Sequence, residues 1–368
     1  MMLDTSNNIF NHMLQESDST FVFSCLSVIN LLWVYFNVFD NLARHEYLEF
    51  SHEDDIECRI IYNDEFRNLS FKLRNIFESS HWYKLQSEGF VYVNNFVFYN
   101  KDLKLIEEDV NPVLKSSNVK IHEFDPEITS EDLTQLIIQT VDCETKWKVN
   151  KLKKIIPFSL ELVEEIFYIN KNKEIKIPMM QKTEKMFKYE TNDFIAIGMH
   201  LNIYCMNFIA VLPKNDISLI DVHKFITGDN RNGLHDMMEE STEHVINLKM
   251  PKFKIESKFD LLAEMKTNIA KENLEEKKVN EKFIKLGNFF LDSKNDFEHI
   301  AMVDINEQGI KEVELKWNQY IPRSDSIKEI TLNRPFLFYI VENMPLDEES
   351  TQFSNVPIFM GRYSGENN

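Results

Sequence analysis

Three side chains of this sequence, those of Ser24, Ser27 and His299, are of the types that a hydrolase uses as nucleophile and general base. No G-x-S-x-G segment surrounds either serine, so the local context of a nucleophile is missing. The sequence also has no H-E-x-x-H pair, phosphate-binding glycine loop or dinucleotide fingerprint. We therefore expect no catalytic residue and no enzyme activity, and we interpret His299 as a buried histidine that is bonded to nearby hydroxyls.

Four cysteines could provide thiol chemistry or metal ligands, and they lie far apart: Cys25, Cys58, Cys143 and Cys205. None belongs to a C-x-x-C motif or to a set with the spacing of zinc ligands. We expect buried free thiols in a reducing compartment, with no metal site and no cofactor.

The N-terminal residues do not have the pattern of a secretory signal, because Asp4 stands where such a peptide carries basic residues. A candidate membrane segment runs from Phe21 to Phe39, but serine and asparagine residues interrupt it. That pattern favours a buried strand followed by a core helix over a membrane span. We expect a cytoplasmic protein. Secretion stays open, since Asn68-Leu69-Ser70 would be a glycosylation sequon in a secreted chain.

The charge balance limits the partners of the chain. There are 41 basic and 60 acidic side chains, which gives a formal net charge of −19. A charge of this sign and size opposes nonspecific binding to nucleic acid or to an anionic membrane surface. Only 8 Gly and 10 Pro occur, and no linker rich in them divides the chain. We therefore expect a single domain over residues 1–368, and a monomer.

The elements that must position these residues change in type along the chain. Up to about Lys84 the apolar residues recur at helical spacing, and a further helix is expected from Asp260 to Glu276. From Gly89 onward most segments alternate and are rich in β-branched and aromatic residues, as strands are. Helices first and many strands afterwards predict an α+β protein with large mixed sheets.

Six segments in succession resemble the motifs of one protein family. They read FSCLS from Phe23, FYINKNKEIKIPMM from Phe167, FIAVLPK from Phe208, LKMPKFKIESKFDL from Leu248, HIAMVDINEQG from His299, and NRPFLFYI with PIFMGR from Asn333 and Pro357. Each motif alone is weak, but their order is specific. The chain resembles a serpin over nearly its whole length, from about Phe21 to Arg362.

The resemblance implies a fold of three mixed β-sheets with about eight helices and an exposed reactive-centre loop, here residues 306–332. In inhibitory members a protease attacks this loop and forms an acyl-enzyme. The loop then enters the central sheet as a new strand, and the strain stored in the native form drives the change.

The family spacing, sixteen residues on from Glu307, predicts the bait bond between Arg323 and Ser324. An arginine before the bond suits a protease whose specificity pocket carries a carboxylate. The expected partner is therefore a trypsin-like serine protease.

The hinge after Gly309 departs from the family, which has small and mostly uncharged residues there. Insertion sends alternate side chains to opposite faces. The set expected to become buried is Ile310, Glu312, Glu314 and Lys316. Burying two carboxylates and an ammonium costs several kcal/mol per ion unless each finds a partner.

A register shifted by one residue is the alternative. It would bury Lys311, Val313, Leu315 and Trp317, a mostly apolar set that still contains a lysine and a bulky tryptophan. Both registers are unfavourable, so we expect the bait to be present and the insertion to be disabled.

Two other departures agree with this expectation. The segment between Phe124 and Trp147 is shorter than in the family, where it contains a helix that crosses the front of the central sheet. Gln139 replaces the family's Asn in the polar cluster that fastens the middle of that sheet, whereas Ser24, Ser27 and His299 match its other members.

The first functional hypothesis is thus a non-inhibitory serpin whose loop binds a partner or is cut as a substrate. The alternative is a suicide inhibitor of a trypsin-like serine protease.

Overall fold

The computed structural model describes residues 2–25, 91–100, 119–124, 135–147, 158–159, 161–202, 206–214, 217–227, 233–261, 263–264, 295–310, 327–345 and 353–365. Within these ranges the helices are α1 (Met2–Glu16), α6 (Leu219–Thr227) and α7 (Gly233–Glu239). The strands are β1 (Phe21–Ser24), β2 (Val91–Asn100), β3 (Val119–Phe124), β4 (Gln135–Cys143), β5 (Thr145–Lys146), β6 (Val163–Asn170), β7 (Lys173–Glu190), β8 (Phe194–His200), β9 (Met206–Pro213), β10 (Thr242–Pro251), β11 (Phe253–Asp260), β12 (Asn295–Asn306), β13 (Gly309–Ile310), β14 (Lys328–Thr331), β15 (Phe336–Pro345) and β16 (Phe353–Tyr363).

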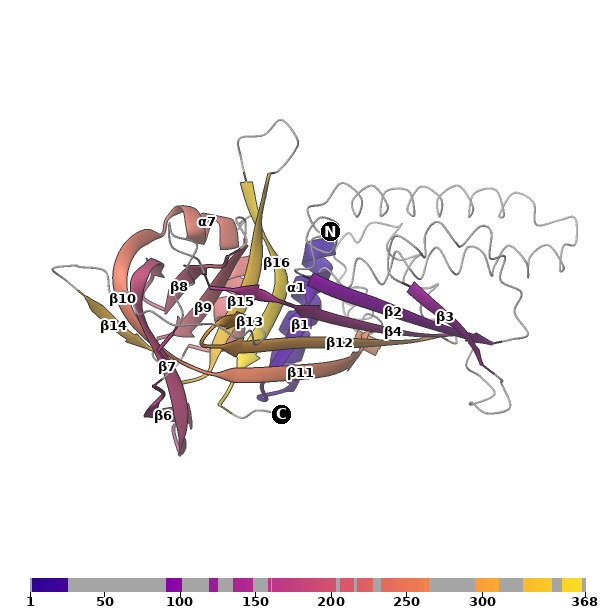
Figure 1. Cartoon of the computed structure of the whole chain (residues 1–368), viewed down its shortest axis with the longest axis horizontal. Helices are drawn as coiled ribbons and strands as arrows, with labels where there is room; N and C mark the ends of the chain where they lie inside the picture. Colours follow the sequence, from indigo (N-terminus) through magenta and orange to yellow (C-terminus); the bar gives the residue numbers. More distant parts are fainter. Residues whose placement is uncertain are drawn as a thin grey trace, which may run out of the picture.

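Helix α1 forms because its apolar residues fall on one face. Ile9, Phe10, Met13 and Leu14 are all buried, and their spacing is that of an amphipathic helix. The helix packs against α6 and lies beside β1 in Figure 1. The sequence prediction of a helix at the N-terminus is confirmed.

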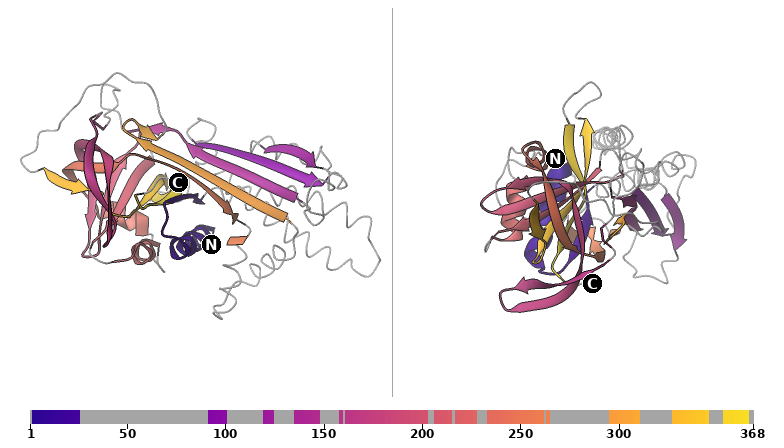
Figure 2. Two further views of the ribbon diagram at one scale, coloured as in Figure 1. Left: turned by 90° about the horizontal axis from the view of Figure 1, so that it is seen from below. Right: turned by 60° about the vertical axis from the view of Figure 1, so that its left-hand side comes forward.

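The described strands form two sheets. The nine-stranded sheet has the order β1-β16-β15-β9-β8-β7-β10-β14, with β6 paired to β7. The seven-stranded sheet has the order β3-β2-β4-β12-β13-β5, with β11 paired to β12. The longest strands of the second sheet, β2, β4, β12 and β11, run side by side, and β2, β4 and β12 reach beyond the nine-stranded sheet (Figures 1 and 2).

Strand β7 explains why the described part contains two hydrogen-bonded sheets where the resemblance implies three. It is 18 residues long. Its first part pairs with β6, its middle with β10 and its last residues with β8. One continuous strand therefore joins what would otherwise be two separate groups of strands.

The nine-stranded sheet is covered on both faces. Along β15, Phe336, Phe338 and Ile340 enter the core that is shared with the seven-stranded sheet. Their alternates Leu337 and Tyr339 enter the core beneath α1, α6 and α7. Strand β9 is buried at every position for the same reason.

A glycine permits close packing at the centre of this sheet. Gly361 lies opposite Phe338 in the β15–β16 pair. A Cβ atom added at Gly361 would lie 2.1 Å from the Phe338 ring, so any side chain there would displace the ring.

Most strand predictions are confirmed, and β1 is the buried strand expected at the start of the Phe21 to Phe39 stretch. The sequence analysis missed β11, β14, α6 and α7. Strand β14, within the region expected as loop, pairs with β10. The helices expected from Ser27 to Lys84, and most of the one expected after Asp260, lie outside the described residues.

Candidate functional site

The start of the expected reactive-centre loop lies inside the seven-stranded sheet. Strand β13 pairs antiparallel with β12 on one side and with β5 on the other. Ile310 is opposite Ile305 and opposite Thr145, and its side chain is completely buried. Below this point β4 and β12 pair directly with each other, in parallel, along residues 135–142 and 295–302. Strand β13 therefore lies between β12 and β5, beyond the end of the direct pairing of β4 with β12.

Gly309 fits this position because it has no side chain. Its φ is +153°, which disfavours other residues. A Cβ atom at this position would lie 2.3 Å from the carbonyl oxygen of Thr145. The close approach of β13 to β5 thus requires glycine.

Backbone hydrogen bonds fix the turn between β12 and β13. The Asn306 Oδ1 atom accepts hydrogen bonds from the N–H groups of Gln308 and Gly309, at 2.9 and 3.3 Å. The N–H of Trp147 donates to the Gln308 carbonyl at 3.1 Å, and that of Phe158 donates to the Glu307 carbonyl at 2.8 Å. These two bonds hold the turn against Trp147 and Phe158.

The Trp147 side chain packs beneath the turn. It is fully buried, and its Nε1–H donates to the Asn306 carbonyl at 3.0 Å. The ammonium of Lys182 lies 5.9 Å from the centroid of the Trp147 ring and 5.5 Å from that of Phe158. Lys182 is almost buried, and Glu184 pairs with it at 2.6 Å. The two aromatic rings and the Lys182 ammonium thus pack together beneath the turn that leads into β13.

Glu307 has a charged partner on the neighbouring strand connection. Its Oε2 atom lies 3.1 Å from Nζ of Lys252, which separates β10 from β11. The Glu307 side chain is 11% exposed and that of Lys252 is 43% exposed. The pair balances the charge of a mostly buried carboxylate.

A row of buried polar residues crosses the middle of the sheet. Asn95, Gln139 and His299 are direct neighbours on β2, β4 and β12, and each is completely buried. Gln139 Nε2 donates to Asn95 Oδ1 at 2.8 Å. Burial lowers the pKa of His299 from 6.5 to about 3, so the imidazole is neutral at pH 7.

The His299 ring also lies against aromatic side chains. Phe23 meets it edge-on, with the ring centroids 5.7 Å apart, and Phe259 stacks on it. Ser24, next to Phe23 on β1, is buried and its hydroxyl donates to the Ile358 carbonyl at 3.1 Å. Of the expected polar cluster, Gln139 and His299 are thus adjacent in the sheet.

Several expected site residues lie outside the described part of the chain: Ser27, Glu312, Glu314, Arg323 and Ser324. The described hinge residues are Glu307, Gly309 and Ile310. They take the unshifted of the two registers considered, in which Ile310 is buried.

Sequence reasoning missed four residues of this region: Asn95, Trp147, Lys182 and Lys252. A signal existed for Asn95, because an asparagine at an inward position of an alternating strand needs a polar partner. The Lys182 and Lys252 contacts join segments that are distant in sequence, so no local pattern could reveal them.

Other features of the described residues limit the chemistry. Cys25 and Cys143 are free and buried, and burial raises the pKa of both thiols, so they are inert. The described helices include none that is both long and apolar enough to cross a membrane. Within the same residues, no three His, Cys, Asp or Glu side chains gather as metal ligands.

Comparison with known proteins agrees with this geometry. The family model described as "Serpin (serine protease inhibitor)" matches residues 156–365, more than half of the chain. Serpin B10 of Rhinolophus ferrumequinum is 28% identical over 212 residues, which cover 54% of this chain and 48% of that protein. Antithrombin-III of Ovis aries is 25% identical over 250 residues, or 64% of this chain and 48% of that protein. The chain thus spans about half the length of these two curated relatives.

The fold has solved counterparts. The structure of a serpin from the trematode Schistosoma haematobium matches with a TM-score of 0.66 at 16% identity, covering 99% of both chains. The α+β architecture is therefore the serpin fold, and the chain belongs to the serpin family of serine protease inhibitors.

Proposed function

We propose that this serpin presents Arg323-Ser324 to a trypsin-like serine protease without trapping it, so that its loop is bound or is cut as a substrate. The single observation that carries the proposal is the register of β13. Ile310 lies opposite Ile305 and Thr145. This register defines which later residues would turn inward if the strand continued.

Continued by two residues, the strand would put Glu312 between Val303 and Cys143. Both neighbours are buried, at 1% and 2% exposed. Two residues further, Glu314 would lie between Ala301 and Val141, which are buried and apolar as well. Neither carboxylate would meet a cation on these two strands.

The energetic consequence is large. An unpaired ion that is moved into an apolar interior costs several kcal/mol, and two carboxylates on one face also repel each other. Insertion would in addition break the direct pairing of β4 with β12 along residues 135–142 and 295–302. The gain from a new central strand is thereby opposed at successive inward positions.

The register shifted by one residue is also unfavourable for insertion. Gly309 and Ile310 already pair in the unshifted register, and Gly309 is the residue whose close approach to Thr145 excludes a side chain. A shift by one would put another residue at that position.

One observation favours the alternative, a trapping inhibitor. The first inward residue of the hinge, Ile310, is already buried between β12 and β5. Lys316 would then lie between His299 and Gln139, where polar groups are available. The two carboxylates remain the obstacle, which is why we favour a loop that does not insert.

The experiment is incubation with trypsin at near-equimolar ratio, followed by a denaturing gel and an assay of trypsin activity. We expect cleavage after Arg323, verified by mass spectrometry, with trypsin still active. The matched Arg323→Gln variant should not be cut at this bond. A covalent band at the summed mass of the two proteins would contradict the proposal.

We further infer a cytoplasmic location. The two described cysteines are unpaired, which suits a reducing compartment. Fractionation of source cells tests this inference, and recovery of the protein from the medium in glycosylated form, modified at Asn68, would contradict it.

A further inference from the structure

A cavity of about 500 Å³ lies on the nine-stranded sheet, and none of the described hinge residues lines it. It is lined by the end of α1, the turn between β6 and β7, the end of β9, the start of α6 and the residues that precede β15. Its size lies in the range of about 300–1,000 Å³ that is typical of small-molecule sites.

Arg362 contributes a buried guanidinium to the lining. Its side chain is 9% exposed, and it donates through Nη1 to the Ser17 carbonyl at 3.0 Å and through Nη2 to Asp18 at 2.9 Å. Its Nε–H is buried and has no hydrogen-bond partner. A buried donor without an acceptor is costly, and a bound acceptor would relieve that cost.

Arg334 contributes a second guanidinium in a fixed orientation. Its Nε and Nη2 atoms both donate to the Pro213 carbonyl, at 2.9 and 2.6 Å, and Nη1 donates to Asn333. Burial lowers the pKa of Arg334, because its charge is partly removed from water. The remaining N–H groups of the Arg334 guanidinium can donate to an anion.

The N-terminus of α6 also borders the cavity. Ser218 caps this nine-residue helix by accepting a hydrogen bond from the Asp221 N–H at 3.1 Å. Leu219 and Ile220, in the first helical turn, line the cavity. Backbone N–H groups at such a position favour a negative charge, and Asp221 in the same turn already supplies one carboxylate, which accepts a hydrogen bond from the Ser218 hydroxyl at 2.7 Å.

The remaining lining is mostly apolar, with Leu14, Ile169, Ile217 and Tyr168, the last of which is 45% exposed. It also contains the polar side chains of Asn170 and Lys171. Asp18 is the acidic residue of the lining, and it is paired with Arg362. The lining thus combines two guanidiniums with apolar surface. A simple inorganic anion would leave the apolar surface uncovered.

We propose that this cavity binds a small hydrophobic carboxylate of the fatty-acid class, with the carboxylate at Arg334 and Arg362 and the hydrocarbon chain against the apolar residues. The match of charge to the two guanidiniums and of apolar surface to the chain selects this occupant. The proposal does not depend on whether the loop inserts.

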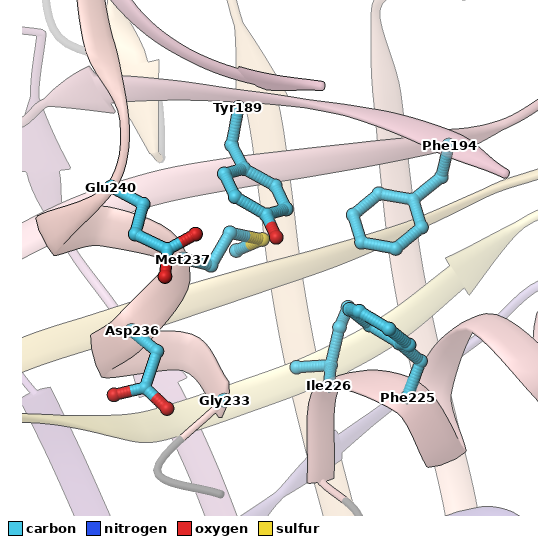
Figure 3. A pocket seen from close by; sticks show the side chains of 8 residues that line it. All are labelled: Tyr189, Phe194, Phe225, Ile226, Gly233, Asp236, Met237 and Glu240. Atoms are coloured by element: carbon cyan, nitrogen blue, oxygen red, sulfur yellow. The ribbon is translucent and has the colours of Figure 1, made fainter. Parts of the chain in front are cut away.

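A second cavity provides an internal control. It has a volume of about 230 Å³ and lies between α6, α7, the end of β7 and the start of β8. Aromatic rings line it, and Asp236 and Glu240 supply two carboxylates (Figure 3). A fatty acid would be repelled there, so changes in this cavity should not affect its binding.

The test is isothermal titration calorimetry of the full chain with dodecanoate below its micelle concentration, beside dodecylamine of the same chain length. We expect dodecanoate to bind at one site per chain, whereas dodecylamine should not bind. Arg334→Gln should weaken dodecanoate binding by about tenfold or more. Phe225→Ala, in the control cavity, should leave it unchanged.

Ile220→Glu gives a second variant that does not disturb the Arg334 contacts. It places a carboxylate in the cavity lining and should abolish dodecanoate binding, while thermal melts verify that each variant is folded. The absence of any heat with dodecanoate, equal binding of dodecylamine, or unchanged binding in folded Ile220→Glu would each overturn the proposal.

Discussion

Ile310 lies directly opposite Thr145 in the antiparallel pair between β13 and β5, and its side chain is fully buried. The first inward position of the hinge therefore already has its place in the sheet. The next inward positions would receive Glu312 and Glu314, between strands whose facing residues are apolar. The hinge thus begins to enter the sheet, but its charges oppose further entry. The function proposed for this serpin rests on this conflict.

Gly309→Ala should release β13 from the sheet. The positive φ at this position costs a residue with a Cβ about 1–3 kcal/mol, and the added atom would collide with the Thr145 carbonyl. We expect faster hydrogen exchange at the backbone amides of Trp147 and Phe158, which donate to this turn. Gly198→Ala is a matched control, because its added Cβ would have no neighbour closer than 3.4 Å. Equal protection in both variants would contradict the assignment.

Lys252→Met should weaken the anchor of the turn by leaving the Glu307 carboxylate without its partner. The pair is partly exposed, so a loss of about 1 kcal/mol in the free energy of unfolding is expected, measured by urea denaturation. Lys258→Met removes a more exposed pair with Glu298 and serves as the comparison. A smaller loss for Lys252→Met than for Lys258→Met would show that Glu307 does not depend on this cation.

Acid should destabilise the protein through two buried histidines. Burial lowers the pKa of His299 and of His223 from 6.5 to about 3. Between these values the unfolded chain binds a proton at each histidine and the folded chain does not. The contribution of the two histidines to the free energy of unfolding is therefore fully present above pH 6.5. It is lost as the pH falls toward 3, by up to about 1.4 kcal/mol per pH unit for each histidine.

The histidine prediction is measured by urea denaturation of the protein and of His299→Gln between pH 7 and pH 4. The variant should show the shallower dependence on pH, because the carboxylates titrate equally in both proteins. The exposed His122→Gln variant serves as the control for the loss of an imidazole at the surface. An unchanged slope in His299→Gln would contradict the buried neutral state.

Removing the inward charges should restore insertion. A triple variant that combines Glu312→Ala, Glu314→Ala and Lys316→Ala has small, neutral residues at the later inward positions. It should form a covalent complex with trypsin, which a denaturing gel would detect. Lys311→Ala changes a charge that the register of β13 assigns to the outward face, and it should not yield the complex. Failure of the triple variant to form a complex would show that charge is not the obstacle.

Most of the strand framework could be predicted from the sequence, because Val119–Phe124 largely alternates and Phe336–Pro345 begins with a continuous apolar run rich in aromatic residues. Helices α6 and α7 were missed since they are short, and the buried His223 of α6 interrupts the apolar pattern. Strand β14 has an exposed pair of charged residues at its start and owes its existence to pairing with β10. Such tertiary pairing leaves little local signal.

The site was predictable to a similar extent. The alternation of the hinge allowed the inward set to be proposed, but the choice between two registers needed the pairing of Ile310 with Ile305. The neighbourhood of Gln139 and His299 followed from the motifs, whereas the position of Asn95 beside Gln139 depends on the β2–β4 register. Sequence spacing does not define such cross-strand contacts.

The most direct test of the central claim is the melting temperature of the protein before and after its loop is cut at Arg323, recorded by scanning calorimetry once trypsin has been inactivated. Insertion of the cut loop would add a strand to the seven-stranded sheet and would thereby stabilise the protein. We predict a nearly unchanged melting temperature, because burial of Glu312 and Glu314 would oppose entry of the loop into the sheet. A sharp rise after cleavage at this bond would contradict the account and would mean that the loop inserts despite its charges.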